Sequence, residues 1–357
     1  MTVATKRRQR TTYIHTKGET GMRAVVMEAA RTPVVRDVEV PAPQSGEVLI
    51  GVRRCGICGT DLHIYEGDFL SGYPLIPGHE FAGVVAAVGS GVAAVRVGDR
   101  VAVDPSLFCG HCDYCQSDRG NHCVNWGAIG DTVNGAMAEF VTAPEANVFK
   151  LPDTMTFQQG AFIEPVACVV HAMNQLQLRT GQSVLLFGAG SMGQLLIQAL
   201  THSGAGELAV VDVARGKLDL ALENGATTAY YAHQAHDLLA NRKRHQGYDV
   251  VVDVTGIPSV IQTQFQYLAP RGTHLQFGVA PVQSAVTINP FDIYHNDWRL
   301  IGSMAINHTF LAALEWLRAG RVRIDPLVSG VIGLAEVPRF FAAGKSADDM
   351  KIQIEIS

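Results

Sequence analysis

"SVLLFGAGSMGQLLIQALTHSGAGELAVVD", residues 183–212, decides the fold. It begins with a short apolar run typical of a buried strand, and apolar residues then recur at helical spacing from Ser191. Between the two, Gly188, Gly190 and Gly193 form a G-x-G-x-x-G motif. Glycines at this spacing permit a tight turn and a close backbone approach to a pyrophosphate at the helix N-terminus. The stretch therefore predicts a dinucleotide-binding turn, against the alternative of a glycine turn without a ligand.

The acidic residue at the end of this stretch indicates which dinucleotide is bound. Asp212 closes the second strand, 22 residues beyond Gly190. Its carboxylate would accept hydrogen bonds from ribose hydroxyls and repel a 2′-phosphate, which favours NAD over NADP. Arg215 and Lys217 nearby keep NADP open. The predicted cofactor contacts are Gly188, Gly190, Ser191, Met192, Gly193, Asp212, Arg215, Thr255 and Gly278.

The surrounding chain predicts two domains of different character. Strand-like "YDVVVDVTG" (248–256) and "THLQFGV" (273–279) alternate with helical segments at 214–226 and 257–272, which indicates a doubly wound parallel sheet. Before it, residues 23–150 alternate short apolar runs with glycine-rich turns, typical of a β-rich, barrel-like domain. Two more helices are expected beyond residue 302. The predicted fold class is therefore α/β with a second, β-rich domain.

Four cysteines in "CGHCDYCQSDRGNHC" (109–123) predict a structural zinc site. Cys109, Cys112, Cys115 and Cys123 follow the spacing C-x2-C-x2-C-x7-C, and four thiolates fill a tetrahedral zinc shell without leaving room for substrate. The histidines inside this loop are interpreted as loop residues. A zinc-ribbon module that binds nucleic acid is the alternative, but the loop lacks the interleaved aromatic and basic residues that such contact needs.

Composition narrows the functional classes further. The 357 residues are 47% hydrophobic and 17% charged, with a formal charge of −5, as in a globular enzyme. Residues 1–21 contain five cationic and one acidic residue, so the remainder carries −9 and would repel nucleic acid. We expect 1–21 to be a disordered extension, with no apolar signal core and no membrane-spanning run. The location expected is the cytoplasm, where clustered cysteines indicate metal rather than disulfides.

A second group of metal-binding residue types lies outside this loop. Cys58, His79, Glu80 and Glu164 would offer a mixed sulfur, nitrogen and oxygen shell with an exchangeable position, the pattern of a catalytic zinc site. Their spacing alone does not unite them. Cys55 and Cys58 form a C-x-x-C pair, so a redox pair or half of a zinc knuckle stays open at this point.

Several motifs occurring together and in order carry a family resemblance. "CGICGTDLH" (55–63), "PGHEFAG" (77–83), the four-cysteine loop, "EPVACVVHA" (164–172) and the glycine motif resemble the zinc-dependent medium-chain alcohol dehydrogenases, in particular their polyol (sorbitol/arabinitol-like) branch. The resemblance spans residues 22–357. It implies a GroES-like catalytic domain at 22–165 and 303–357, a Rossmann NAD-binding domain at 166–302, two zinc ions per subunit, and a homo-oligomer, with a tetramer favoured over a dimer.

The resemblance also assigns roles in the catalytic site. It makes Cys58 and His79 zinc ligands, and it leaves open whether Glu80 or Glu164 is the third. Thr60 matches the position whose hydroxyl bonds the substrate oxygen, and His63 would pass the released proton outward. By the same comparison, Cys55 and Cys168 are buried core thiols, and Asp61 is a supporting carboxylate.

The substrate implied by the resemblance is a sugar alcohol. The acidic "EPVA" motif is similar to polyol dehydrogenases, so we expect oxidation of a secondary hydroxyl of a pentitol or hexitol to a ketose with NAD. Tyr65 and Arg299 are the predicted substrate contacts. A threonine, 2,3-butanediol or other secondary-alcohol dehydrogenase is the alternative enzyme. A non-catalytic, nucleotide-binding regulatory protein is the more remote alternative.

Overall fold

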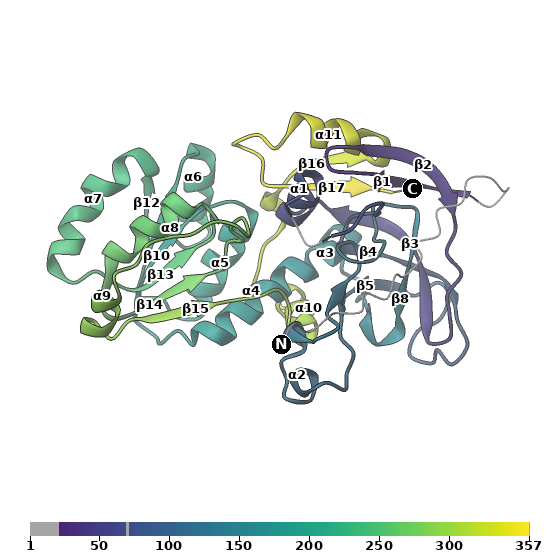
Figure 1. The fold of residues 1–357 in the computed structure, drawn as a ribbon, viewed down its shortest axis with the longest axis horizontal. Helices are drawn as coiled ribbons and strands as arrows, with labels where there is room; N and C mark the ends of the chain where they lie inside the picture. The colour runs from purple at the N-terminus through teal and green to yellow at the C-terminus, as the bar shows by residue number, and fades with distance from the viewer. Residues whose placement is uncertain (1–20, 69–70, 357) are drawn as a thin grey trace, which may run out of the picture.

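Two separate sheets organise the chain (Figure 1). The structure, a computed structural model, describes residues 21–68 and 71–356. The predicted disordered extension, residues 1–21, lies outside the described residues except for Gly21, which begins the first strand. No helix among the described residues is long and apolar enough to cross a membrane.

The first sheet is six-stranded and wholly parallel. Along the chain the sheet grows from β10 outward to β11 and β12 on one side, and then from β13 outward to β14 and β15 on the other side. The strand order therefore reverses between β10 and β13, and sheets of this kind bind dinucleotides at such a point. Five helices connect these strands. In sheet order the strands are β12 (Thr228–Tyr231), β11 (Glu207–Asp212), β10 (Ser183–Phe187), β13 (Tyr248–Asp253), β14 (Leu268–Gln276) and β15 (Arg299–Gly302); the helices are α5 (Ser191–His202), α6 (Arg215–Glu223), α7 (Ala232–His245), α8 (Pro258–Gln264) and α9 (Pro290–His295).

The second sheet joins both ends of the chain. Its order is β16 (Val328–Gly333), β17 (Lys351–Glu355), β3 (Glu47–Gly56), β4 (Glu80–Val88), β5 (Arg100–Val103) and β9 (Val148–Lys150), with β8 (Phe140–Pro144) paired to β3. The smaller ribbons are β1 (Gly21–Met27) with β2 (Pro33–Glu39), and β6 (Ser106–Leu107) with β7 (Gly127–Ala128). The remaining helices are α1 (Gly59–Glu66), α2 (Asp113–Gln116), α3 (Phe157–Ala161), α4 (Ile163–Leu176), α10 (Phe310–Arg318) and α11 (Val337–Ala343). The predicted α/β class, with a β-rich catalytic domain beside a Rossmann sheet, is confirmed.

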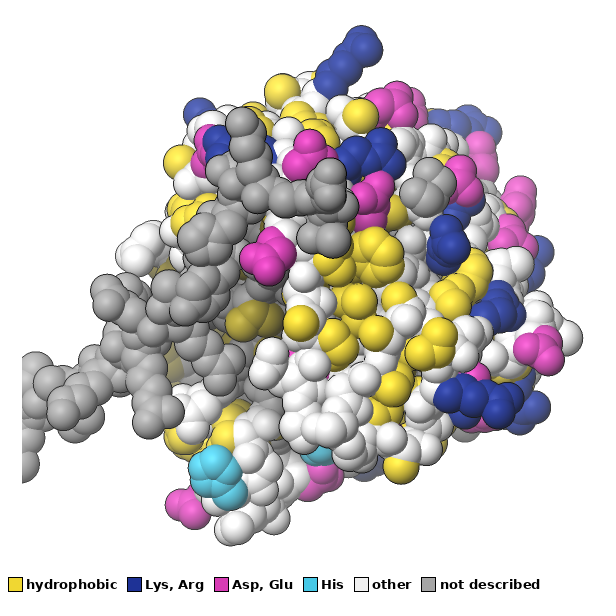
Figure 2. Space-filling view, turned by 90° about the vertical axis from the view of Figure 1, so that its right-hand side faces the viewer, with side chains coloured by type: hydrophobic (Ala, Val, Ile, Leu, Met, Phe, Trp, Pro, Cys, Tyr) yellow, Lys and Arg dark blue, Asp and Glu magenta, His cyan; other side chains and the backbone are white. Residues whose placement is uncertain are grey.

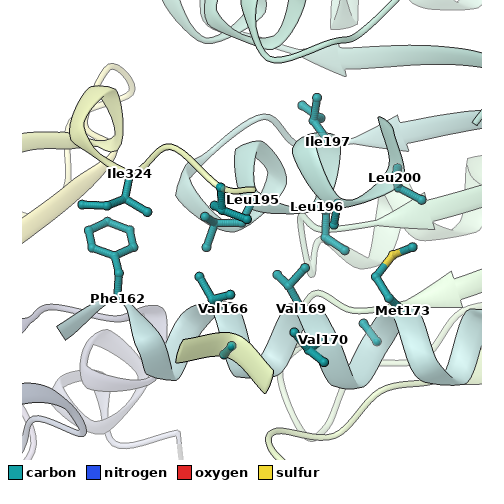
Figure 3. Packing of buried hydrophobic residues seen from close by; sticks show 14 of the residues in the cluster. Phe162, Val166, Val169, Val170, Met173, Leu195, Leu196, Ile197, Leu200 and Ile324 are labelled. Carbon is teal, nitrogen blue, oxygen red and sulfur yellow. The ribbon is translucent and has the colours of Figure 1, made fainter. Parts of the chain in front are cut away.

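Helix α4 connects the two sheets without a linker. The predicted domain boundary at 165/166 falls inside this helix, which begins at Ile163. Val166, Val169 and Met173 of α4 face Leu195 and Leu196 of α5 in one buried cluster (Figure 3). Because the same cluster includes residues of both sheets, the two domains share a continuous apolar core beside the site.

Charges of both signs cover the end of the molecule formed by the catalytic domain. In Figure 2 its apolar side chains lie towards the middle of the face, and lysine and arginine are interspersed with aspartate and glutamate above them and to their right. A nucleic-acid surface requires clustered cations. On this face, then, the described side chains give no support to nucleic-acid binding.

A buried histidine should make stability depend on pH. His274 lies on β14, where its Nε2 is 2.8 Å from Gln264 Oε1, and burial lowers its pKa from 6.5 to about 4. As the pH falls below 6.5, His274 becomes protonated in the unfolded chain but stays neutral in the folded chain until about pH 4. The contribution of His274 to the free energy of unfolding is therefore complete above pH 6.5 and is lost as the pH falls towards 4. We expect the His274→Gln variant to lose about 2–3 kcal/mol less than the parent between pH 7 and 4 in urea unfolding. Equal losses would contradict the assignment.

Candidate active site

Cys58 begins helix α1 just beyond the end of β3. It is the N-cap residue, in extended conformation, and its N–H donates to Asp61 Oδ2 at 2.8 Å. The other oxygen of Asp61 accepts the Gly78 N–H at 3.2 Å. Asp61 is fully buried, and burial raises the pKa of its carboxyl to about 6. This one carboxylate therefore fixes two loops side by side, as expected for a supporting residue.

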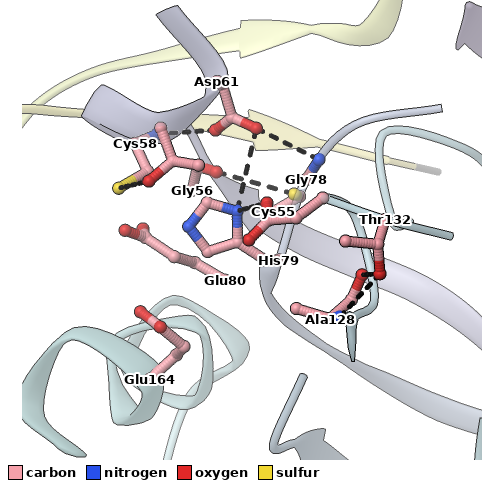
Figure 4. Close-up of polar contacts among 12 residues, drawn as sticks. Cys55, Gly56, Cys58, Asp61, Gly78, His79, Glu80, Ala128, Thr132 and Glu164 are labelled. Atoms are coloured by element: carbon pink, nitrogen blue, oxygen red, sulfur yellow. Dashed lines mark hydrogen bonds and ion pairs between the residues drawn. The ribbon is translucent and has the colours of Figure 1, made fainter. Parts of the chain in front are cut away.

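His79 is oriented by carboxylates behind it. Its Nδ1 lies 3.2 Å from Asp131 Oδ1 and 3.8 Å from Asp61 Oδ1, and its other nitrogen faces Cys58 and Glu80 (Figure 4). Burial lowers the pKa of His79, but the negative charge of Asp131 and its neighbours raises it by more, so the net shift of the pKa is upward. A histidine held through one nitrogen by a carboxylate is typical of metal ligands.

The side chains around His79 fit a metal ion. Ligand atoms of Cys58, His79 and Glu80 lie within 4.8 Å of one another, a sulfur, nitrogen and oxygen set suited to zinc. Glu164, outside this set, lies in the first turn of α4 and directs its carboxylate towards the cluster (Figure 4). Burial raises the pKa of Glu164 to about 8. Its Oε1 accepts a hydrogen bond from the Cys168 thiol at 3.5 Å, and burial raises the pKa of that thiol.

Glu80 is paired with a buried lysine. Lys351 Nζ lies 2.6 and 2.7 Å from the two carboxylate oxygens, and it also donates to Ile57 O at 3.4 Å. The Glu80 and Lys351 side chains are 1% and 3% exposed. Burial lowers the pKa of Lys351, but the charge of Glu80 raises it more, so the lysine stays cationic. Both carboxylate oxygens of Glu80 are thus already hydrogen-bonded to a cation.

The two predicted proton-transfer residues lie on α1. Thr60 Oγ1 accepts from Cys58 Sγ at 3.9 Å, so the structure brings Thr60 to the cluster. His63, one turn further along, is half-buried, and its Nδ1 lies 2.9 Å from Asp68 Oδ1. This places a histidine–carboxylate pair between the cluster and the exposed end of the helix.

The four-cysteine loop forms a compact sulfur cluster. Cys112 Sγ lies 3.6 Å from Cys115 Sγ and 3.9 Å from Cys123 Sγ, and Cys109 Sγ lies 3.9 Å from Cys115 Sγ. In a tetrahedral site with Zn–S bonds of about 2.3 Å, the sulfurs are about 3.8 Å apart. The loop therefore fits zinc, and none of the seven cysteines of the chain is in a disulfide.

The glycine turn joins β10 to α5 as its motif predicts. Gly188 has a φ of +98°, and a Cβ on Gly193 would lie 1.9 Å from Gly188 O, so neither position admits a side chain. Gly190 is the N-cap of α5, directly before Ser191 and Met192. Asp212, at the end of β11, accepts the Ala189 N–H at 2.6 Å through Oδ2.

Comparison with known proteins agrees with this geometry. Residues 44–153 match the alcohol dehydrogenase GroES-like domain family, and residues 191–319 match the zinc-binding dehydrogenase family. The chain is 34% identical over 340 residues to D-arabinitol dehydrogenase 1 of Uromyces fabae, covering 94% of this chain and 97% of that protein.

This chain belongs to the zinc-dependent alcohol dehydrogenase family.

Solved structures of this family have the same fold. A protein described as a zinc-binding dehydrogenase from Sinorhizobium meliloti 1021, bound to NADP, is 32% identical with a TM-score of 0.91, covering 94% of this chain and all of that one. The 2R,3R-butanediol dehydrogenase of Bacillus subtilis is 30% identical with a TM-score of 0.85, also over 94% and 100% of the two chains. The predicted family is confirmed.

The two predicted substrate contacts, Tyr65 and Arg299, stay predictions, and the structure shows their immediate surroundings. The Tyr65 ring stacks on Phe341 with centroids 5.5 Å apart and packs against the catalytic-domain core. Arg299 is exposed at the amino end of β15, whereas the glycine turn lies at the carboxyl ends of the parallel strands. Arg215 also pairs locally, with Asp219 at 3.1 Å.

Three carboxylate or lysine residues of this dehydrogenase site were missed by the sequence motifs. Asp131 orients His79, and Lys351 holds Glu80. Asp253, fully buried at the end of β13, accepts from the hydroxyl of Thr255 at 2.7 Å and from the N–H of Gly256 at 2.9 Å. Its backbone oxygen accepts the Gly278 N–H at 2.9 Å, so Asp253 fixes the turns that contain the two remaining predicted cofactor contacts. A charged residue inside a strand-like apolar run was the available signal for Lys351 and Asp253.

Proposed function

We propose that this chain oxidises a secondary hydroxyl of a pentitol or hexitol to the ketose and transfers the hydride to NAD. The observation that carries the proposal is the Cys58–His79 cluster, set beside a carboxylate on α4 and joined through that helix to the dinucleotide sheet. The similarity to a D-arabinitol dehydrogenase over 94% of the chain supports the polyol class.

The residues divide the chemistry between them. A zinc ion at the cluster would polarise the substrate hydroxyl, and a bound dinucleotide would accept the hydride. Thr60 would hydrogen-bond the substrate oxygen from its place beside Cys58. His63, paired with Asp68, would carry the released proton towards solvent. Asp61 would hold the Cys58 and His79 loops in register, and Asp131 would orient the His79 ring.

The dinucleotide proposed is NAD. Asp212 stands at the end of β11, where its negative charge disfavours a 2′-phosphate. The NADP-bound relative from Sinorhizobium meliloti makes NADP the competing cofactor. The proposed contacts remain the glycine turn, Asp212, Thr255 and Gly278.

The third zinc ligand proposed is Glu164. Both oxygens of Glu80 are engaged by Lys351, which lowers their capacity to bind a metal. Glu164 accepts a weak hydrogen bond from the Cys168 thiol at 3.5 Å. Its carboxylate is therefore more available to a metal ion than that of Glu80. The four-cysteine loop would hold the structural zinc.

We also propose a homo-oligomer, with a tetramer favoured over a dimer. β15 is an edge strand of the parallel sheet, and its Leu300 is 46% exposed. Phe291 and Tyr294 of the neighbouring α9 are 61% and 79% exposed. We also propose a cytoplasmic location, because seven free cysteines suit a reducing compartment.

A substrate panel tests the function. Reduction of NAD and of NADP is measured with arabinitol, sorbitol, threonine and 2,3-butanediol, before and after a chelator. We expect kcat/KM for a pentitol or hexitol with NAD to exceed the others by about tenfold or more, a margin that one or two specific polar contacts supply, and the chelator to abolish it. Activity confined to threonine, butanediol or monohydric alcohols would favour a threonine, 2,3-butanediol or other secondary-alcohol dehydrogenase. The likeness to the Bacillus subtilis butanediol dehydrogenase makes this the second candidate function. Dinucleotide binding without turnover of any substrate would indicate the regulatory alternative.

A further inference from the structure

A chain of buried amide groups leads from the glycine turn to the catalytic part of the molecule. It starts at Gln194 on α5, which is fully buried. Gln194 Nε2 donates to Ala189 O at 3.1 Å, inside the glycine motif, and to Lys217 O at 2.8 Å, in the first turns of α6. One side chain therefore joins the turn after β10 to the helix after β11.

Both backbone polar groups of Ala189 are hydrogen-bonded to side chains. Its N–H donates to Asp212 Oδ2 at 2.6 Å, and its carbonyl accepts from Gln194. The preceding Gly188 has a φ of +98°, a backbone conformation that glycine adopts without a steric cost, and its N–H donates to Val211 O at 2.9 Å. The orientation of the Ala189 peptide, and with it the direction of the neighbouring N–H groups, depends on these two side chains.

The chain of hydrogen bonds continues through Asn224. Asn224 Nδ2 donates to Gln194 Oε1 at 2.8 Å, and Asn224 Oδ1 accepts from Arg323 Nη2 at 3.1 Å. Gln198, one turn after Gln194, binds the backbone of Arg323 twice, at 2.8 Å and 3.1 Å. Gln194, Gln198 and Asn224 are all at least nine-tenths buried, and each is satisfied.

Arg323 belongs to the segment that leads into the catalytic sheet. Residues 321–324 lie in the connection between α10 and β16, the strand beside β17. Val322 and Ile324 of this segment are buried in the same cluster as Leu195 and Leu196 of α5. Figure 3 shows Ile324 beside Leu195. The segment is thus docked on α5 by apolar packing, while its backbone and one guanidinium complete the amide chain.

A fully satisfied polar chain in such a core needs an explanation other than stability. Leucine at both Gln194 and Asn224 would remove the hydrogen bond between the two amides at both of its ends, a change that is often nearly neutral, but it would also take their partner away from the Ala189 and Lys217 carbonyls and from the Arg323 guanidinium. What an apolar pair cannot do is fix the Ala189 and Lys217 carbonyls, since it has no donors.

We propose that Gln194 and Asn224 are positioning residues for the dinucleotide: they hold the glycine turn in its binding conformation and make cofactor affinity depend on the docking of residues 321–324. This inference rests on the dinucleotide binding of the proposed function. Through the amide chain, cofactor binding and the contact between the two domains would each stabilise the other.

Leucine variants separate this role from a structural one. The full-length variants are Gln194→Leu, Asn224→Leu, the double variant and Arg323→Leu. Thr201→Val on the same helix is the control, because its hydroxyl bonds only the backbone oxygens of Ile197 and Gly225 and no side chain of the amide chain. NADH binding is measured by fluorescence titration, and unfolding, zinc content, KM and kcat are measured alongside. Each single leucine at an amide leaves a buried partner unpaired and should lower the melting temperature and raise the Kd for NADH by about tenfold.

The double variant decides the question. We expect the double variant to lose less stability than the two single variants added together, because only the Gln194–Asn224 bond is removed at both ends, while its Kd for NADH stays about tenfold raised and KM for NAD rises by a larger factor than kcat falls. A Kd that recovers together with stability would overturn the proposal. Arg323 is exposed, so Arg323→Leu should fold in any case; a Kd raised about threefold supports the coupling to 321–324 and an unchanged one refutes it. Failure of the parent chain to bind NADH would instead refute the proposed function.

Discussion

Replacing Cys58 with serine should abolish turnover and remove one zinc ion per chain. The Cys58 sulfur completes a ligand set with His79 and a carboxylate, and a serine hydroxyl is a far weaker zinc ligand at neutral pH. We expect kcat/KM to fall by about a thousandfold or more and zinc content to drop from about two ions per chain to about one. Elemental analysis beside a steady-state assay provides the measurement.

Cys55→Ala is the matched control for this loss. Cys55 is fully buried, three residues before Cys58, and a Cβ on Gly78 would lie 2.7 Å from its sulfur. Burial raises the pKa of its thiol, so it behaves as a small apolar side chain rather than a thiolate. We expect this variant to keep both zinc ions and near-parental turnover, with a loss of about 1 kcal/mol of stability. Equal zinc loss in both variants would restore the C-x-x-C pair as a unit.

The parts of the site that sequence predicts are those built from local motifs. The glycine turn and the four-cysteine loop each lie within a short stretch, so residue type and spacing nearly define their geometry. The same holds for Cys58 and Thr60, whose relation is set by the first turn of α1. The Cys58–His79–Glu164 grouping came from family resemblance, because its members lie on different elements.

The parts that sequence misses depend on pairing across the fold. Lys351 reaches Glu80 across 271 residues only because β17 lies beside β3, whose neighbour β4 begins at Glu80. Tyr65 lies on the same helix α1 as Thr60, yet its ring stacks on Phe341 of α11, an element from the other end of the chain. β12 and α7 were not predicted, since all four residues of β12 are only half-buried and lack a strand-like alternation. A helix that crosses a domain boundary, as α4 does, leaves no linker composition to detect.

Lys351→Met should have the second largest effect, first on stability. It leaves the buried carboxylate of Glu80 without its cation, and breaking a buried ion pair by removing one partner costs about 3–5 kcal/mol. We expect a loss of this size in urea unfolding, together with reduced turnover, because the freed carboxylate lies within reach of the Cys58–His79 cluster. Adding Glu80→Gln should recover most of the stability, since no charge is then left unpaired.

The Glu80→Gln variant also distinguishes the two candidate third ligands. If Lys351 occupies both oxygens of Glu80 as the distances of 2.6 and 2.7 Å indicate, Glu80→Gln should retain about two zinc ions per chain, whereas Glu164→Gln should lose the catalytic one. Zinc content measured at pH 7 for both variants, with Cys58→Ser as the reference for a lost ligand, gives the comparison. Loss of zinc in Glu80→Gln and retention in Glu164→Gln would make Glu80 the ligand, and Lys351 would then stabilise a carboxylate shared between a metal and an ammonium group.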